Sequence, residues 1–284
     1  MSGIEVTTVV SAAELAGLLA DDQQPVVLDA SFDLADTGAG ERRFGELHVA
    51  GSLYVHLDRD LCAPKTGGNG RHPLPARAAF ARTVGGLGIG PDSRVVVLDA
   101  QGGPYAARLW WMLRWLGHAH VAVLDGGLAA WRDSGGAVDA VPVTPVAREP
   151  YPERPSLVAT VDAAAVLRRP ADTVVLDARS PERFRGDAEP IDPVAGRIPG
   201  AMNRFHRANL DAAGRFKPAE ALRSEFEALL AGRPPAAVIH SCGSGVTACH
   251  NLLAMEHAGL AGSVLYPGSW SEWSADPTRP VALG

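Results

Sequence analysis

The sequence has few cysteines, no excess of basic residues and no long apolar run, and each shortage excludes a class of protein. Its 3 cysteines, Cys62, Cys242 and Cys249, are too few and too scattered for a disulfide framework. The formal net charge of -6 argues against non-specific nucleic-acid binding. No run of about 18 apolar residues is present, so no membrane span is expected.

The N-terminal stretch also lacks a basic segment followed by an apolar core. Glu5 and Glu14 fall there instead, so we expect no signal peptide. Without a disulfide framework, a reducing cytoplasm is the expected location, and it would keep a reactive thiol usable. With 46% apolar and 20% charged residues in 284, the composition is that of a globular protein long enough for two domains.

Short apolar segments alternate with helical patterns along the chain. A capping-box pattern from Ser11 to Glu14 predicts a helix start, and an apolar periodicity predicts another helix around 109–116. Buried strands are predicted at 25–30, 94–99, 121–124, 173–178 and up to about 239. This alternation predicts an α/β fold with a mostly parallel sheet.

The second half of the chain repeats the order of the first. Gly200 corresponds to Gly51, 149 positions earlier, whereas Cys242 corresponds to Ala100, 142 positions earlier. The first copy is therefore longer between these points, and we place its extra residues within 62–75. We predict two domains, 1–142 and 157–284, joined by a stiff proline-rich linker at 143–156. Only the second copy keeps a cysteine at this point, so we expect the chemistry there.

Cys242 opens the loop Cys-Gly-Ser-Gly-Val-Thr between a predicted strand and a predicted helix at 248–257. Gly243 and Gly245 permit backbone angles that turn N–H groups inward, and the helix N-terminus adds partial positive charge. Both effects favour the thiolate of Cys242, which is the nucleophilic form. The alternative is a buried structural cysteine in an ordinary turn, because free cysteine packs as a small hydrophobe.

This loop, set within two such repeats, resembles that of the tandem-domain sulfurtransferases of the rhodanese family. The resemblance is greatest to the 3-mercaptopyruvate branch, whose loop is Cys-Gly-Ser/Thr-Gly-Val-Thr, and less to the thiosulfate branch, which usually has Cys-Arg-Lys-Gly-Val-Thr. It covers nearly the whole chain, and further landmarks fall at 29–31, 48–51, 124–127 and 177–179. It implies two tandem rhodanese-like domains, each a mostly parallel sheet flanked by helices, with the first domain inactive.

The resemblance implies an activity for Cys242. A sulfane sulfur would pass from 3-mercaptopyruvate to a thiol or cyanide through a persulfide on this cysteine, with thioredoxin among the candidate acceptors and thiosulfate as the alternative donor. Gly243, Gly245, Val246 and Thr247 would line the substrate site and hold the anionic sulfur. Such chemistry needs no metal and no organic cofactor.

The resemblance also implies roles for residues outside the loop. Arg183 matches the substrate-binding arginine, whose guanidinium can fork onto a carboxylate. Asp58 and His72 match site-facing residues, and with Ser244 they would relay a proton to the departing enolate. As isolated residues, Asp58 and His72 would more often be capping groups in a loop.

Two positions depart from the family pattern. Ile191 follows Glu189-Pro190, where mercaptopyruvate enzymes usually carry a second arginine. Arg197 stands where a histidine usually precedes Ile-Pro-Gly. Either Arg197 compensates as a second substrate-binding arginine, or Arg183 alone grips the carboxylate, and the donor preference depends on which holds.

Three other functions fit the sequence less well. A cysteine phosphatase needs an arginine six residues after the cysteine, and that position is Ala248. The glycines at 85–90 precede a predicted strand, whereas a dinucleotide-binding fingerprint follows one. A non-catalytic binding protein is disfavoured because the second copy retains its cysteine.

Overall fold

The computed structural model describes residues 8–284, so Glu5, which entered the argument on the signal peptide, lies outside the described part. The chain divides into two compact units. The N-terminal unit comprises the chain up to Cys62, Pro75–Leu157 and Ala213–Arg215. The C-terminal unit comprises Ala63–Leu74, Val158–Ala212 and Phe216–Gly284. Within residues 8–284, no helix combines the length and apolarity that crossing a bilayer requires.

The N-terminal unit contains a five-stranded sheet in the order β1-β6-β5-β2-β4, and every pairing in it is parallel. Its strands are β1 (Val9–Val10), β2 (Val26–Asp29), β4 (Leu53–Tyr54), β5 (Val95–Leu98) and β6 (Val121–Leu124). A separate antiparallel pair is formed by β3 (His48–Val49) and β7 (Val138–Asp139). The helices are α1 (Ala12–Leu19), α2 (Ala39–Glu46), α3 (Leu57–Asp60), α4 (Arg77–Gly86), α5 (Pro104–Trp115) and α6 (Gly127–Asp133).

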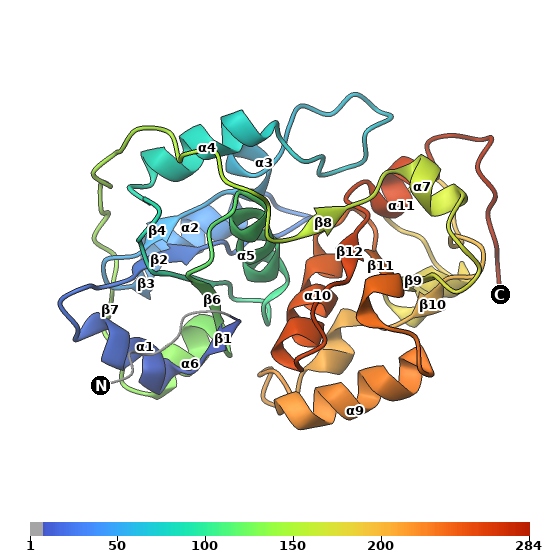
Figure 1. Cartoon of the computed structure of the whole chain (residues 1–284). Coiled ribbons are helices and arrows are strands. Elements are labelled where there is room, and N and C mark those ends of the chain that lie inside the picture. The colour runs from blue at the N-terminus through green and yellow to red at the C-terminus, as the bar shows by residue number, and fades with distance from the viewer. Residues whose placement is uncertain (1–7) are drawn as a thin grey trace. The chain divides into compact units, whose positions relative to one another are not determined.

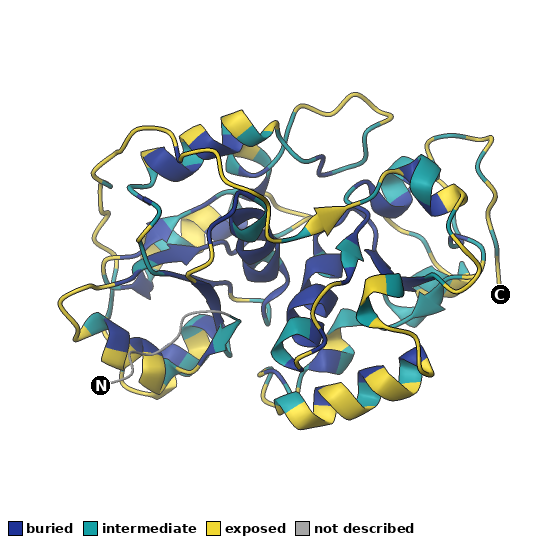
Figure 2. Cartoon of the chain, in the orientation of Figure 1, coloured by how far each residue is buried: buried dark blue, intermediate teal, exposed yellow. Residues whose placement is uncertain are grey.

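Local sequence explains why these elements form. The predicted capping box at Ser11 and Glu14 is present at the start of α1, where each side chain accepts a hydrogen bond from the other's backbone N–H. The four residues of β5 are all buried valines and leucine, as expected for a strand covered on both faces. Figure 2 shows the central strands β2, β5 and β6 mostly buried, whereas α1 carries exposed residues.

The C-terminal unit contains a second five-stranded parallel sheet, in the order β10-β9-β11-β12-β8. Its strands are β8 (Ala159–Thr160), β9 (Val174–Asp177), β10 (Met202–Asn203), β11 (Val238–Ser241) and β12 (Val264–Leu265). Its helices are α7 (Ala163–Leu167), α8 (Pro181–Arg185), α9 (Ala219–Leu230), α10 (Thr247–His257) and α11 (Ser269–Trp273), with short 3-10 turns η1 (His206–Asn209) and η2 (Pro235–Ala237). In Figure 1, α10 lies beside β11 and β12, and α9 packs against α10.

The two sheets have the same strand order when β8, β12, β11, β9 and β10 are matched to β1, β6, β5, β2 and β4. Two units, each a parallel sheet flanked by helices, confirm the predicted fold class. One boundary differs: β11 runs to Ser241, beyond the predicted end near 239, because buried His240 and Ser241 continue the pairing with β9. Cys242 therefore follows the strand directly.

Two segments belong to units other than those expected from their positions in the sequence. Ala63–Leu74, within the stretch to which we assigned the extra residues of the first copy, belongs to the C-terminal unit. The proline-rich stretch at 143–156 belongs to the N-terminal unit, where the N–H of Tyr151 donates to the carbonyl of Ala81 (2.9 Å). Neither segment contains a named helix or strand.

Candidate active site

The Cys242 loop joins β11 to α10, and Gly245 shapes it. Gly245 has φ +77°, a left-handed angle that glycine adopts without strain. Its N–H donates to Sγ of Cys242 at 3.1 Å. A Cβ at Gly245 would lie 2.3 Å from the carbonyl oxygen of Pro267, so only glycine fits. The loop therefore turns a backbone donor toward the sulfur, as the glycine spacing predicted.

The start of α11 holds this loop in place. The N–H of Cys242 donates to Oγ of Ser269 (3.1 Å), and the N–H of Trp270 donates to the carbonyl of Cys242 (3.0 Å). The N–H of Ser271 donates to the carbonyl of Gly243 (2.8 Å). Ser269 has φ +53°, a strained angle for a residue with a side chain, and its hydroxyl also bonds the carbonyl of Tyr266. The backbone strain thus lies at Ser269, the residue whose hydroxyl accepts from the N–H of Cys242.

The three cysteines lie in different surroundings. Cys242 is 1% exposed, at the carboxyl end of the sheet's central strand. Cys249 is fully buried on α10, where its thiol donates to the carbonyl of Gly245 (3.3 Å). Cys62 is partly exposed and ends a segment of the N-terminal unit. Of the three, only Cys242 sits in a loop between a strand and a helix N-terminus.

His72 and Ser244 form a hydrogen-bonded pair within the C-terminal unit. Nδ1 of His72 lies 2.7 Å from Oγ of Ser244, and both residues are buried. His72 comes from Ala63–Leu74, and Ser244 comes from the Cys242 loop. The fold thus brings together two predicted site residues that are 172 positions apart.

Arg183, on α8, is held by two buried carboxylates. Its Nε and Nη2 bond both oxygens of Glu189 (2.7 to 3.1 Å), and Nη2 also reaches Oδ2 of Asp192 (3.0 Å). Burial alone would raise the pKa of Glu189, but hydrogen bonds from Arg183 and from backbone N–H groups outweigh it and lower that pKa. The guanidinium of Arg183 is only 16% exposed, so its orientation is fixed.

A second arginine of this cluster, Arg179, ends the family landmark at 177–179, but the sequence predicted no role for it. It bonds Asp177 through Nε and Nη2 (2.8 to 3.1 Å) and reaches Glu189 at 3.4 Å, and its guanidinium lies over the Trp270 ring. Burial opposes the charge of Arg179, but Asp177, Glu189 and the nearby Cys242 raise its pKa. It stays charged and supplies positive potential behind the loop.

Arg71 is the third arginine, and sequence reasoning missed it. Its Nη1 lies 2.5 Å from Oδ1 of Asp192, the carboxylate that also binds Arg183. Burial raises the pKa of Asp192, although both arginines act in the opposite direction. Its place next to His72 in the sequence was the available clue, but the pairing with Asp192 spans 121 positions.

The other predicted site residues lie as follows. Val246 is buried at the N-cap of α10, and Thr247 is the first residue of that helix. Arg197 places its guanidinium over the Phe184 ring, and its backbone pairs with Ala282. Asp58 lies on α3 of the N-terminal unit, so its predicted role stays a prediction.

The corresponding loop of the first copy, between β5 and α5, is filled differently. The carboxylate of Asp99 accepts hydrogen bonds from the N–H groups of Gln101, Gly103, Tyr105 and Ala106 (2.8 to 2.9 Å). Burial raises the pKa of Asp99 even so. In the first copy, these loop N–H groups therefore already have a hydrogen-bond acceptor, the carboxylate of Asp99.

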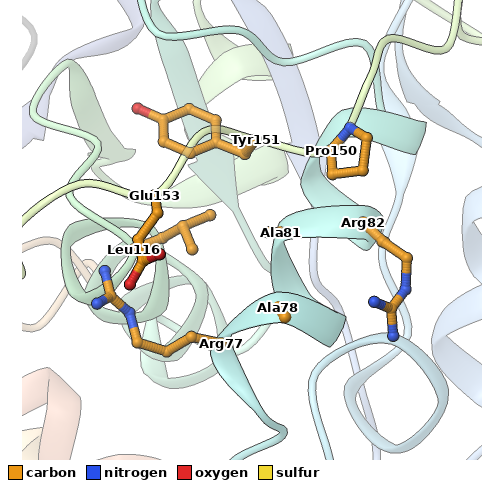
Figure 3. A pocket seen from close by; sticks show the side chains of 8 residues that line it. All are labelled: Arg77, Ala78, Ala81, Arg82, Leu116, Pro150, Tyr151 and Glu153. Atoms are coloured by element: carbon orange, nitrogen blue, oxygen red, sulfur yellow. The ribbon is translucent and has the colours of Figure 1, made fainter.

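The N-terminal unit also contains a pocket of about 290 Å³, drawn in Figure 3. Arg77 and Arg82 on α4 flank an apolar floor that includes Leu116, and Tyr151 lies on the proline-rich stretch. Arg77 is already engaged, donating to the carbonyl of Arg154 (2.7 Å). No cysteine is among the residues that line this pocket.

Comparisons with known proteins identify the family of the chain. The family model for the rhodanese-like domain matches residues 11–134 and 160–276. Along its whole length the chain is 45% identical to the whole of a Pseudomonas aeruginosa protein named "Probable 3-mercaptopyruvate sulfurtransferase". It is 36% identical to "Thiosulfate/3-mercaptopyruvate sulfurtransferase 2" of Arabidopsis thaliana, over 90% of this chain and 81% of that one.

A solved structure is also similar to this chain. The 3-mercaptopyruvate sulfurtransferase from Leishmania major superposes with a TM-score of 0.83 at 28% identity, covering 94% of this chain and 74% of that one. The chain therefore belongs to the rhodanese-like family, with two such domains in tandem. It is a sulfurtransferase.

Proposed function

We propose that this enzyme transfers a sulfane sulfur from 3-mercaptopyruvate to a thiol or cyanide through a persulfide on Cys242. The observation that carries the proposal is the N–H of Gly245 donating to Sγ of Cys242. A backbone donor aimed at sulfur stabilises the thiolate, which is the attacking form, and later the persulfide anion. The relatives named for mercaptopyruvate support the same donor.

The first half-reaction forms the persulfide. The Cys242 thiolate attacks the sulfur of 3-mercaptopyruvate, so an S–S bond forms and the donor's C–S bond breaks. The electron pair of that bond leaves on carbon as the enolate of pyruvate, which takes up a proton. In the second half-reaction a thiolate or cyanide attacks the outer sulfur, the S–S bond breaks and the Cys242 thiolate returns.

His72 and Ser244 would supply the proton. Their hydrogen bond of 2.7 Å gives a path by which the Ser244 hydroxyl protonates the enolate carbon and recovers a proton from His72. Ser244 is two residues from Cys242, so its hydroxyl is near the leaving group. Asp58 is the predicted third member of the relay, and its part in it stays a prediction.

Arg183 would bind the donor carboxylate, with the loop from Gly243 to Thr247 forming the floor of the site. Its Nη1 takes no part in the bonds to Glu189 and Asp192. Arg197 would contribute positive charge at longer range from its place over Phe184. Thiosulfate is the alternative donor, and the name of the Arabidopsis relative includes both.

We place the reaction in a reducing, cytoplasmic compartment, with a cellular thiol such as that of thioredoxin as acceptor. A reducing environment would keep Cys242 from forming a stable disulfide and would supply thiols for the second half-reaction. No resident metal or organic cofactor enters these steps.

Substitution of Cys242 tests the proposal. Cys242→Ser should reduce pyruvate release from 3-mercaptopyruvate to background, because a serine hydroxyl is not ionised at neutral pH and forms no persulfide. The melting temperature should stay close to that of the wild type. Cys62→Ser, at a partly exposed thiol in the N-terminal unit, is the matched control and should keep full turnover.

Wild-type turnover by Cys242→Ser would reject the mechanism. The donor is tested separately, by comparing kcat/KM for 3-mercaptopyruvate and thiosulfate at one pH. The proposal requires the larger value for 3-mercaptopyruvate, and a larger value for thiosulfate would replace that donor without changing the nucleophile.

A further inference from the structure

We propose that Arg71 is a second substrate-binding arginine, which grips the donor carboxylate together with Arg183. This inference rests on the proposed function and adds a residue that determines donor specificity. Both arginines belong to the C-terminal unit, although Arg71 comes from the Ala63–Leu74 segment and Arg183 from α8.

The two guanidinium groups converge on Gly243, the residue next to the nucleophile. A Cβ at Gly243 would lie 2.9 Å from Nη2 of Arg71 and 3.5 Å from both Nη1 and Nη2 of Arg183. Because Gly243 has no side chain, both guanidinium groups can approach the loop backbone next to the nucleophile. A carboxylate bound by both groups would fit a small mercapto acid whose sulfur meets Cys242.

Two of the three guanidinium nitrogens that face Gly243 lie outside the ion pairs with Glu189 and Asp192. Arg71 uses Nη1 for Asp192, and Arg183 uses Nε and Nη2 for Glu189 and Asp192. Nη2 of Arg71 and Nη1 of Arg183 take no part in these bonds. Nε of Arg71 is also buried without a hydrogen-bond partner among the described residues. A planar guanidinium group can donate two parallel hydrogen bonds, one to each oxygen of a carboxylate.

Asp192 would position the two arginines. Its two oxygens divide between them, with Oδ1 on Arg71 and Oδ2 on Arg183. Its side chain is only 3% exposed, so it is a fixed bridge rather than a surface ion pair. With Asp192 already in contact with both, each arginine is held in its orientation before the donor arrives.

The backbone at Arg71 is anchored to the same support as the Cys242 loop. The N–H of Arg71 donates to Oγ of Ser271 (2.9 Å), and the N–H of Ser271 donates to the carbonyl of Gly243 (2.8 Å). One residue of α11 thus fixes both the loop and the arginine. The distance between the cation and the nucleophile is thereby set by the fold.

The test compares a donor that has the carboxylate with one that lacks it. Arg71→Ala should raise KM for 3-mercaptopyruvate by about tenfold to a hundredfold, the effect of losing a charge-assisted hydrogen bond, with little change in kcat. KM for a neutral mercaptoketone should stay unchanged. Arg71→Lys, which keeps the charge but not the fork, should fall between. Arg183→Ala is the positive comparison, and Arg185→Ala, at an exposed arginine paired with Asp187, is the negative one.

A second measurement works whichever donor the enzyme prefers. Pyruvate should protect Cys242 from alkylation by iodoacetamide, and Arg71→Ala should raise the half-protecting concentration of pyruvate by a similar factor. If the wild type does not use 3-mercaptopyruvate, the proposed donor is wrong. The protection assay would still test whether Arg71 binds a carboxylate. Unchanged KM and unchanged protection, or an equal loss for both donors with a lowered melting temperature, would overturn the proposal.

Discussion

At the scale of single residues, the site consists of one sulfur and the groups that stabilise its charge. Gly245 donates to Cys242 at 3.1 Å, and Arg179, charged and buried, lies behind the loop. These groups are fixed before substrate arrives, because α11 holds the loop backbone and carboxylates hold the arginines. A hydrogen-bond donor that is already in position does not have to rearrange during the reaction. Its removal should therefore lower kcat.

Gly245→Ala should therefore lower kcat about a hundredfold, the usual effect of losing one donor to a developing anion. The added methyl would lie 2.3 Å from the carbonyl of Pro267, so the loop must move and the N–H must leave the sulfur. Steady-state kinetics with 3-mercaptopyruvate measures the effect.

Gly232→Ala is the control for backbone strain in this experiment. Gly232 also has a left-handed φ (+85°), but a Cβ there would meet nothing within 4 Å. It should lose a little stability and no activity. Equal kinetic losses in the two variants would show that strain, and not the displaced donor, is the cause.

At the scale of elements, the chain contains one strand-loop-helix motif twice, with different groups at the loop centre. In the second copy, Cys242 follows β11 and its sulfur accepts from a loop amide. In the first, Asp99 follows β5 and its carboxylate accepts from four amides. In the first loop, the carboxylate of Asp99 therefore takes the place of a bound anion. Its hydrogen bonds to the loop amides explain how this loop keeps its shape without a nucleophile.

Asp99→Ala should destabilise the protein by more than about 3 kcal/mol, because several buried N–H groups lose their acceptor. Asp99→Asn keeps one acceptor oxygen and should lose less. Asp133→Ala, at an exposed residue ending α6, is the matched control. Denaturant unfolding measures all three, and an Asp99→Ala midpoint equal to that of the control would contradict this account of the loop.

The sequence predicted the elements better than it predicted the contacts between them. Runs such as the valines of β5 indicate buried strands, and the Ser11–Glu14 pattern set the start of α1. Nothing local indicates that Arg71 pairs with Asp192, because the two are 121 positions apart and meet only when Ala63–Leu74 joins the C-terminal unit.

The position of Asp99 before Ala100 was visible in the repeat, but not its role. Comparing the two copies in the sequence shows that the first lacks the cysteine. It does not show which group accepts hydrogen bonds from the loop amides. That depends on loop curvature, which brings residues up to 7 positions apart around one carboxylate. Contacts of this kind follow from backbone angles that composition does not reveal.

At the scale of the whole molecule, duplication gives two cores of the same design, and each buries titratable groups. His240, in β11 beside the nucleophile, is fully buried with Nε2 3.1 Å from Oγ of Ser263. Burial lowers its pKa from 6.5 to about 3. A histidine that stays neutral when folded makes the stability of the protein depend on pH.

The sign of that dependence follows from linkage. Between pH 6.5 and about 3, His240 binds a proton in the unfolded chain but not in the folded one. Stability is therefore complete above 6.5 and falls on acidification, by up to about 1.4 kcal/mol per pH unit from this group. His240→Gln should remove this contribution, so its unfolding free energy should fall less steeply with acid than that of the wild type. Parallel curves for the two proteins would contradict the prediction.

The most direct test of the central claim is the location of the transferred sulfur. The protein would be incubated with 3-mercaptopyruvate without acceptor, digested, and examined by mass spectrometry. The account predicts one added sulfur on the peptide that contains Cys242, none on those with Cys62 or Cys249, and its removal by cyanide with release of thiocyanate. Pyruvate release without added sulfur on Cys242, or sulfur on another cysteine, would contradict it.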